Sequence, residues 1–119
     1  MGTERIVIQI PRWRPTSLNS LMNSHWAKAA RMKKADKSMV AIYCSGMPKA
    51  KGKRRVTFNI LLGKGQRRTD PDACLKSGLD ALVACGMLVD DSDKYCEIMP
   101  VTQFRKPGWY GTLIALEDI

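Results

Sequence analysis

In VTFNILLGKGQRRTDPDACLKSGLDALVACG, residues 56–86, the hydrophobic pattern changes from the period of a strand to the period of a helix. Alternate residues of VTFNILL, 56–62, are large and apolar, which predicts a strand with one buried face. Leu75, Leu79 and Leu82 then recur at intervals of four and three residues, which predicts a helix with one apolar stripe. A strand followed by a helix is the unit from which sheets with packed helices are built.

The residues around this helix indicate where it begins and ends. We expect it to begin near Asp70, with Thr69 or Asp70 as its N-cap and Pro71 in the first turn. Gly86 is well suited to end it. Gly78 lies in the middle, where glycine costs about 1 kcal/mol relative to alanine. Its presence indicates a close approach of the helix backbone to the sheet or to a second subunit.

The N-terminal half supplies another strand and a longer helix. RIVIQI, 5–10, is β-rich and predicts a strand, and the proline-containing segment 11–19 predicts a loop. A helix is predicted over residues 24–43, because apolar residues there recur three and four apart. The predicted core stripe of this helix consists of Met32, Ala35, Met39 and Ile42, and its basic side of Lys28, Arg31, Lys34 and Lys37.

The C-terminal third is predicted to form strands. MLVDD, 87–91, predicts a short strand, and residues 96–102 and 109–117 predict two final strands joined across a turn at KPG, 106–108. The elements together predict a single domain over residues 1–119 of the α/β (α+β) class. We expect a mixed β-sheet with two packed helices, in the order β-α-β-α-β-β.

The charge of the chain favours a polyanionic partner. Lys and Arg number 20 against 11 Asp and Glu, which gives a net charge of +9. Clustered basic charge of this size favours DNA or RNA, although a basic chain without such a partner is the alternative. No run of apolar residues is long enough to span a membrane, and no secretory signal opens the chain, so we expect a cytoplasmic protein without membrane contact.

The four cysteines do not form a recognisable metal motif. Cys44, Cys74, Cys85 and Cys96 include no C-x-x-C pair, and His25, the single histidine, is distant in sequence. A zinc site is therefore poorly supported. We expect reduced, mostly buried thiols that pack as small hydrophobic side chains.

Two acidic pairs frame the helix that begins near Asp70. Asp70 and Asp72 lie at its start, and Asp90 and Asp91 follow its end. Either pair alone is typical of a structural role, because acids suit the first turn of a helix and also occur in solvated turns. If the chain returns beside the preceding strand, the two pairs converge. Converging carboxylates bind Mg²⁺ or Mn²⁺, which activate water for phosphodiester cleavage.

Lys76 lies four residues after Asp72 and four before Asp80. It can form an ordinary ion pair on the helix surface, worth about 0.3–0.5 kcal/mol. It can equally be a fixed cation beside the metal carboxylates, where it would bind the scissile phosphate. The spacing does not distinguish the two roles.

Basic residues on both sides of the predicted strand 56–62 are candidates to hold a phosphate backbone, although a solvated basic loop is the alternative. They are Lys64, Arg67 and Arg68 after the strand, and Lys51, Lys53, Arg54 and Arg55 before it or at its start. GKG at 63–65 lacks the P-loop pattern, so no nucleotide cofactor is expected. The tryptophans Trp13, Trp26 and Trp109 could stack on bases, but core or partly exposed packing is the commoner role.

A longer motif joins these candidates. The run R-x-D-x-D-x-x-x-K-x-x-x-D-A-L from Arg68 to Leu82, followed by G-x-x-x-D-D from Gly86 to Asp91, resembles the RusA-type Holliday junction resolvases. The segment PTSLN, 15–19, is similar to the Pro-Ser-Asn start of that family. The resemblance covers most of the chain.

The resemblance implies a function and a role for each matched residue. Asp70, Asp72 and Asp91 would be catalytic carboxylates that hold Mg²⁺ or Mn²⁺, and Lys76 the essential lysine, with a less defined role for Asp90. The family acts as a homodimer and cuts four-way DNA junctions symmetrically, in recombination and repair, and it is frequent in phages. Ala73 replaces the usual asparagine of the family, which weakens the support of a neighbouring carboxylate.

Two alternatives remain open from the sequence. One is a basic DNA- or RNA-binding module without catalytic activity, in which the aspartates only stabilise a helix terminus. The other is a metal-dependent nuclease that cuts branched or flapped DNA in general.

Overall fold

A five-stranded mixed sheet forms one layer of the computed structural model, which describes residues 5–68, 71–105 and 108–119. The strand order is β1-β5-β2-β3, and β4 also pairs with β2. β5 is antiparallel to both of its neighbours, whereas β3 and β4 run parallel to β2. The strands are β1 (Arg5–Pro11), β2 (Arg54–Leu62), β3 (Cys96–Ile98), β4 (Thr102–Arg105) and β5 (Gly111–Asp118).

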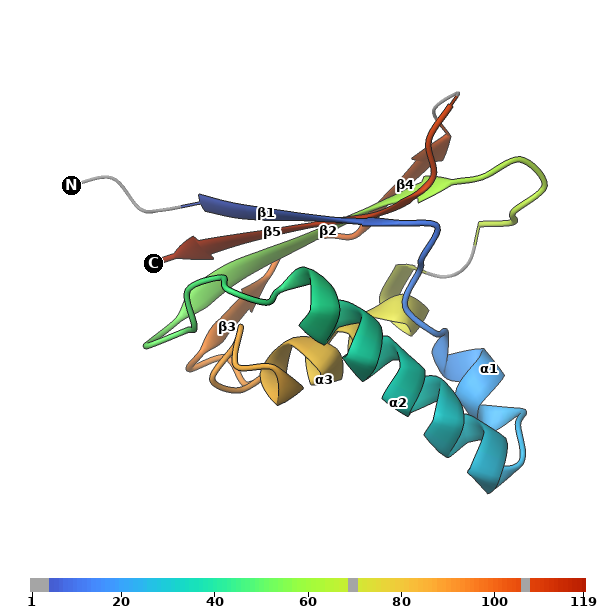
Figure 1. The fold of residues 1–119 in the computed structure, drawn as a ribbon, viewed down its shortest axis with the longest axis horizontal. Helices are drawn as coiled ribbons and strands as arrows, with labels where there is room; N and C mark the ends of the chain where they lie inside the picture. Colours follow the sequence, from blue (N-terminus) through green and yellow to red (C-terminus); the bar gives the residue numbers. More distant parts are fainter. Residues whose placement is uncertain (1–4, 69–70, 106–107) are drawn as a thin grey trace.

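In the part of the chain that the structure describes, the helices lie together on one side of the sheet, and none covers its other side (Figure 1). They are α1 (Leu18–Met22), α2 (Trp26–Tyr43) and α3 (Pro71–Ala84). The predicted α+β domain with two main helices is therefore confirmed. The short helix α1 was predicted as loop. It is a single turn, begun by a hydrogen bond from the Ser20 N–H to the Ser17 Oγ (3.2 Å), and it is too short to show a hydrophobic period.

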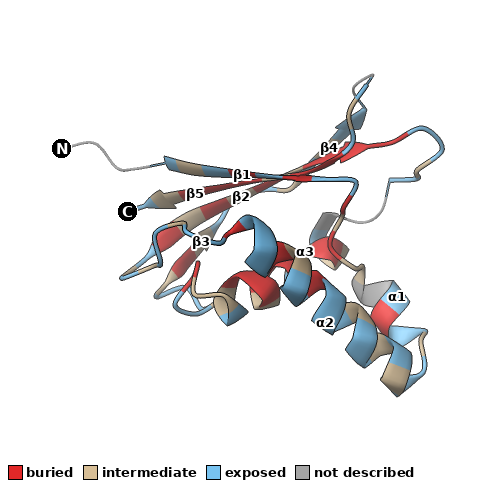
Figure 2. Cartoon of the chain, in the orientation of Figure 1, coloured by how far each residue is buried: buried red, intermediate tan, exposed pale blue. Residues whose placement is uncertain are grey.

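The core lies between the sheet and the helices α2 and α3 (Figure 2). The alternating residues of β2 are buried as predicted, namely Val56, Phe58, Ile60 and Leu62. From α3, Leu79 and Leu82 are buried and Leu75 is half-buried, which confirms the predicted stripe. The chain returns from β2 through α3 to β3, because two parallel strands need a crossover connection between them.

The predicted core stripe of α2 is only partly correct, since Met39 packs against the core and Met32 is half-buried. Ala35 is exposed and the Ile42 side chain is 68% exposed, whereas Asp36, Val40 and the C-cap residue Cys44 are buried. The buried residues recur every four positions, but the face begins with an aspartate. A search for apolar periodicity therefore selects the wrong face, because it does not count a buried carboxylate as a core residue.

The two ends of α3 follow the sequence closely. The helix begins at Pro71, and the proposed caps Thr69 and Asp70 lie outside the described residues. At its C-terminus Gly86 has φ +82°, and its N–H donates to the Val83 carbonyl (3.1 Å). The N–H of Met87 donates to the Leu82 carbonyl (2.9 Å), which completes a Schellman motif and confirms Gly86 as the stop.

Gly78 allows close packing of α3 on the sheet. A Cβ at this position would lie 2.9 Å from two ring atoms of Phe58 in β2. Of the two sequence interpretations, the close approach to the sheet is therefore the one observed. Glycine lowers the helix propensity at this position. Because it has no side chain, however, the Phe58 ring can pack directly against the helix backbone.

MLVDD, 87–91, does not form the predicted strand. Met87 and Leu88 are buried in the core immediately after the Schellman motif, and the Met87 carbonyl accepts a hydrogen bond from the Arg54 Nη1 (3.0 Å). A side chain therefore supplies the hydrogen bond that a neighbouring strand would otherwise supply. The apolar run that suggested a strand is used for core packing, and β3 takes the place beside β2 instead.

The strand predicted over 96–102 is divided into β3 and β4 by residues 99–101. Val56 pairs with Ile98, and Asn59 pairs with Thr102, so the edge strand has one more residue than β2 in this interval. Such a bulge suits Pro100, which cannot donate to a strand ladder. The predicted turn at 106–108 lies partly outside the described residues. Within the described chain no helix is long and apolar enough to cross a membrane.

Candidate functional site: the groove between α2 and α3

Three adjoining hollows run along the seam between α2 and α3, and we call them together the α2–α3 groove. The middle hollow has a volume of about 360 Å³. The hollow next to α1 shares Lys76 and Asp80 with it, and the hollow at the other end shares Lys37 and Ala84. The middle hollow is lined by Lys37, Lys76, Asp80, Val83, Ala84, Asp90 and Asp91.

Lys76 joins two segments of the chain across the middle hollow. Its Nζ lies 3.3 Å from the Asp80 Oδ1 and 3.6 Å from the Asp91 Oδ2. The hydrogen bond with Asp80, the charge of Asp80 and then the charge of Asp91 raise the pKa of Lys76, so the ammonium keeps its proton at neutral pH. The predicted ion pair with Asp80 is confirmed. The contact with Asp91 is additional, and it joins α3 to the loop that follows it.

The structure brings part of the predicted acidic site together. Asp91 lies beside Lys76, and Asp90 lines the same hollow. Asp72 is exposed in the first turn of α3, one turn before Lys76. Asp70 lies outside the described residues. Among the residues that are described, no three histidine, cysteine or acidic side chains are grouped closely enough to hold a metal ion.

The acidic side chains in and beside this groove offer only carboxylate oxygens, which is the donor chemistry that Mg²⁺ and Mn²⁺ prefer. Of the carboxylates that the sequence assigns to such an ion, the structure describes Asp91, beside Lys76, and Asp72, one turn before Lys76 on α3. A bound divalent cation would compete with the Lys76 ammonium for Asp91, because both positive groups would draw on the same carboxylate. The donor chemistry therefore suits the predicted metal, although the described side chains are not by themselves grouped closely enough to hold it.

Lysines of α2 form the opposite wall of the groove. Lys33 lines the hollow next to α1, Lys37 lines the middle hollow, and Lys34 lines the third. The sequence placed Lys34 and Lys37 on a basic helix side but did not place them near Lys76. The spacing of residues within one helix does not show which face contacts another helix. The proximity of the α2 lysines to Lys76 therefore follows only from the packing of α2 on α3.

The predicted backbone-binding residues of the β2–α3 loop are exposed. Lys64, Arg67 and Arg68 lie in the segment that extends beyond the end of the sheet and leads into α3 (Figure 1). The loop has a defined shape, since the Gly63 N–H donates to the Gln66 Oε1 (2.7 Å). Other side chains also hold it. Arg105 Nη1 donates to the Gly63 carbonyl (2.7 Å), and Arg14 Nη1 donates to the Arg67 carbonyl (2.9 Å).

Two other predicted backbone-binding residues have structural partners. Arg54 is 2% exposed, and its guanidinium donates to Asp118 (2.8 Å) and to three backbone carbonyls. Arg55 forms ion pairs with Glu97 (3.4 Å) and Glu117 (3.5 Å). The idea that Arg54 grips DNA is therefore wrong, because its charge is used inside the protein. Arg55 is only partly exposed and is shared between two acids of the sheet.

A buried carboxylate behind the groove was missed from the sequence. Asp36 is 5% exposed and accepts hydrogen bonds from Trp13 Nε1 (3.1 Å), the Thr16 N–H (2.8 Å) and Ser77 Oγ (2.6 Å). It ties the chain before α1, helix α2 and helix α3 together. Because Ser77 is the residue after Lys76, this network fixes the helix that carries the candidate site.

The three tryptophans have different surroundings. Trp13 is buried, as the packing role predicts, and Trp109 is half-buried. Trp26, by contrast, is 77% exposed in the first turn of α2, with its ring 5.4 Å from that of His25. Packing therefore accounts for Trp13 but not for Trp26.

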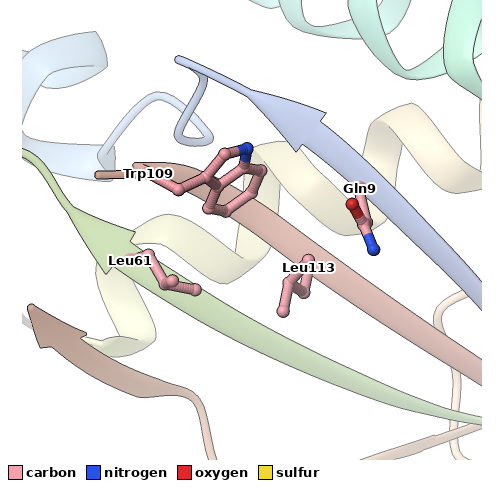
Figure 3. Close-up of a pocket in the computed structure, with 4 residues that line it drawn as sticks. All are labelled: Gln9, Leu61, Trp109 and Leu113. Atoms are coloured by element: carbon pink, nitrogen blue, oxygen red, sulfur yellow. The ribbon is translucent and has the colours of Figure 1, made fainter. Parts of the chain in front are cut away.

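A separate hollow, of about 220 Å³, lies on the face of the sheet away from the helices. Figure 3 shows its four lining side chains, Gln9, Leu61, Trp109 and Leu113, above the strands. None of the four is ionisable, so these side chains offer contact area and hydrogen bonds but no acid or base. The α2–α3 groove is the better candidate for a chemical site.

Comparison with known proteins does not add a family. No protein-family model matches the chain, and no curated protein matches it.

Proposed function

We propose that this chain is a metal-dependent endonuclease that resolves four-way DNA junctions by paired, symmetric strand cleavage. The observation that supports it best is the contact of Asp91 with Lys76 (3.6 Å). Lys76 belongs to the first segment of the motif and Asp91 to the second. The proposed chemistry requires this lysine and this carboxylate to lie at a common site. They meet in a groove whose opposite wall carries the lysines of α2, an arrangement that suits a phosphodiester-cleaving centre.

Asp70, Asp72 and Asp91 would hold Mg²⁺ or Mn²⁺ in this proposal. When bound, such an ion lowers the pKa of water and stabilises negative charge on phosphate. Lys76 contributes a protonated ammonium at the same place, and Asp80 keeps that ammonium oriented through its ion pair (3.3 Å). On release from Asp91, the Lys76 ammonium would be free to bind a phosphate oxygen of the strand being cut.

The lysines of α2 and the β2–α3 loop would position the DNA. Lys33 and Lys37 face the groove, and Lys64, Arg67 and Arg68 are exposed on the loop that leads into α3. Contacts of this kind bind phosphates without reading sequence, so they suit a substrate defined by its branched shape. A homodimer would present two such sites to a substrate with two-fold symmetry.

The direct test is incubation of the chain with a synthetic mobile four-way junction and Mg²⁺, with nicks mapped on all four arms. The proposal predicts paired nicks in opposed strands, and none when EDTA replaces Mg²⁺. Equal cutting of a flap or a plain duplex would support the general branched-DNA nuclease instead. Tight binding of the junction without cleavage in Mg²⁺ or Mn²⁺ would support the non-catalytic binding module.

A variant separates catalysis from binding. Asp72→Asn should abolish cleavage and retain junction binding, since it removes a metal ligand and also a negative charge near phosphate. Loss of binding together with cleavage would show that Asp72 is needed for the structure. Binding itself should weaken steeply with salt through counterion release, and a flat response would contradict the role given to the lysines and arginines.

A further inference from the structure

Two cysteines from different helices meet at the far end of the α2–α3 groove. Cys44 is the C-cap of α2, and Cys85 directly follows the last residue of α3. Cys85 packs against the core cluster that contains Cys44, and the two side chains interact. When it is protonated, the Cys85 thiol also donates to the Leu82 carbonyl (3.5 Å). Both are free cysteines in this structure. No role in the proposed nuclease chemistry uses either of them.

The loop after α2 holds the two cysteines together. The Met47 N–H donates to the Cys44 carbonyl (3.0 Å), and the Lys49 Nζ donates to the Cys85 carbonyl (2.8 Å). The Ala50 N–H also donates to the Gly86 carbonyl (2.9 Å). The pair therefore does not depend on a single side-chain conformation, because backbone hydrogen bonds fix the segments that carry the two sulfurs.

The two sulfurs differ in exposure and in charge. Cys44 is 1% exposed, whereas Cys85 is half-buried and lines the third hollow of the groove together with Lys34 and Lys37. The interaction with Cys44, a backbone hydrogen bond from Met87 and the positive charge of Lys49 lower the pKa of Cys85 to about 6. The interaction with Cys85 and burial raise the pKa of Cys44. Cys85 is therefore the thiolate that solvent reaches, and Cys44 is the protonated partner behind it.

We propose that Cys85 and Cys44 form a redox-active dithiol that a peroxide oxidises to an intramolecular disulfide. The Cys85 thiolate attacks one peroxide oxygen. An S–O bond forms, the O–O bond breaks and hydroxide leaves, so Cys85 becomes a sulfenic acid and the peroxide is reduced. The Cys44 sulfur then attacks the Cys85 sulfur, and the S–O bond breaks. The departing hydroxyl group leaves as water with the proton of the Cys44 thiol. A dithiol reductant reverses the change by thiol–disulfide exchange.

The test is treatment of the folded 119-residue chain with stoichiometric hydrogen peroxide, followed by intact mass and peptide mapping. The expected product has lost about 2 Da, and one peptide pair links Cys44 to Cys85 and separates after reduction. The variant Cys96→Ser, which removes a buried cysteine outside the pair, should give the same product. A disulfide that involves Cys74 or Cys96, or no disulfide when free glutathione in the same tube is oxidised, would overturn the proposal.

A second measurement does not depend on variants of the buried Cys44. The rate of Cys85 alkylation by iodoacetamide in the unaltered chain should rise with pH with a midpoint of about 6. The variant Lys49→Met should move this midpoint upward, because it removes the nearest positive charge. A midpoint in the ordinary range for cysteine, about 8.5, would contradict the role of Cys85 as the attacking thiolate. Neither experiment measures DNA cleavage, so a failure here is distinct from a failure of the proposed nuclease function.

Discussion

The two sides of α3 use charge in opposite ways. On the inner side, Ser77 donates to Asp36, a 5% exposed carboxylate with three hydrogen-bond donors. On the outer side, Lys76 is 60% exposed and shares its charge between Asp80 and Asp91. A buried charge contributes to stability only while all its partners are present, whereas an exposed pair is worth little to folding. The outer charges can therefore exchange partners with a ligand, and the inner charge cannot.

The largest effect is expected on the inner side. Asp36→Ala leaves three donors, two of them buried, without an acceptor and should lower the free energy of unfolding by about 3–5 kcal/mol. Urea denaturation measures it. The control Ser38→Ala, at an exposed position of the same helix, should change stability by less than about 0.5 kcal/mol. A loss for Asp36→Ala as small as that of the control would show that burial does not distinguish the two sides of α3.

A second buried charge extends the comparison to the sheet. Arg54→Met should cost about 2–3 kcal/mol, because it deprives the carbonyls of Met87, Pro48 and Lys49 of a donor. Lys53→Met, one residue earlier and exposed, provides the matched control. Equal unfolding midpoints for the two variants would contradict the structural role given to Arg54.

Close packing on the inner side of α3 predicts a smaller loss. In Gly78→Ala the gain in helix propensity, about 1 kcal/mol, is opposed by a Cβ placed 2.9 Å from the Phe58 ring. We expect a net destabilisation of about 1 kcal/mol, measured by thermal unfolding. Gly52→Ala, where the new Cβ meets no atom within 4 Å, should be neutral or slightly stabilising. A clear stabilisation by Gly78→Ala would show that the Phe58 ring moves aside at little cost and that packing at this position is not close.

The smallest effect on folding is expected on the outer side. Asp80→Asn removes one partner of the Lys76 ammonium and should change stability by only about 0.3–0.5 kcal/mol. Denaturation next to the unaltered chain detects the difference. A loss above about 2 kcal/mol would place Asp80 in the structural network and would remove the distinction between the two sides.

The fold was more predictable than the site because its main signals are local. The alternation in β2, the stripe of α3 and the turn at Gly86 depend on residues within one element, and each was confirmed. The core face of α2 was missed because it contains Asp36, whose burial depends on donors from distant segments. The apolar run at Met87 suggested a strand because a strand and a core-packing segment have the same composition.

The site was predictable as a list of residue types but not as an arrangement. The motif identified Asp91 and Lys76, and the sequence suggested that their two segments converge. The distance of 3.6 Å between the two side chains, however, cannot be derived from their spacing in the sequence. The lysines of α2 on the opposite wall, such as Lys37, come from a segment with no motif. The cysteine pair could not be predicted from the sequence either. Cys44 and Cys85 lie together only because α2 and α3 end side by side.

The proposed function depends most on Asp91, and one paired measurement tests it. Asp91→Asn and the control Asp93→Asn, an exposed residue of the same turn, are compared for junction cleavage in Mg²⁺ and for urea unfolding in the same preparations. We predict that Asp91→Asn unfolds within about 0.5 kcal/mol of the unaltered chain but no longer cuts, while Asp93→Asn does both normally. Cleavage by Asp91→Asn at the rate of the control would contradict the account.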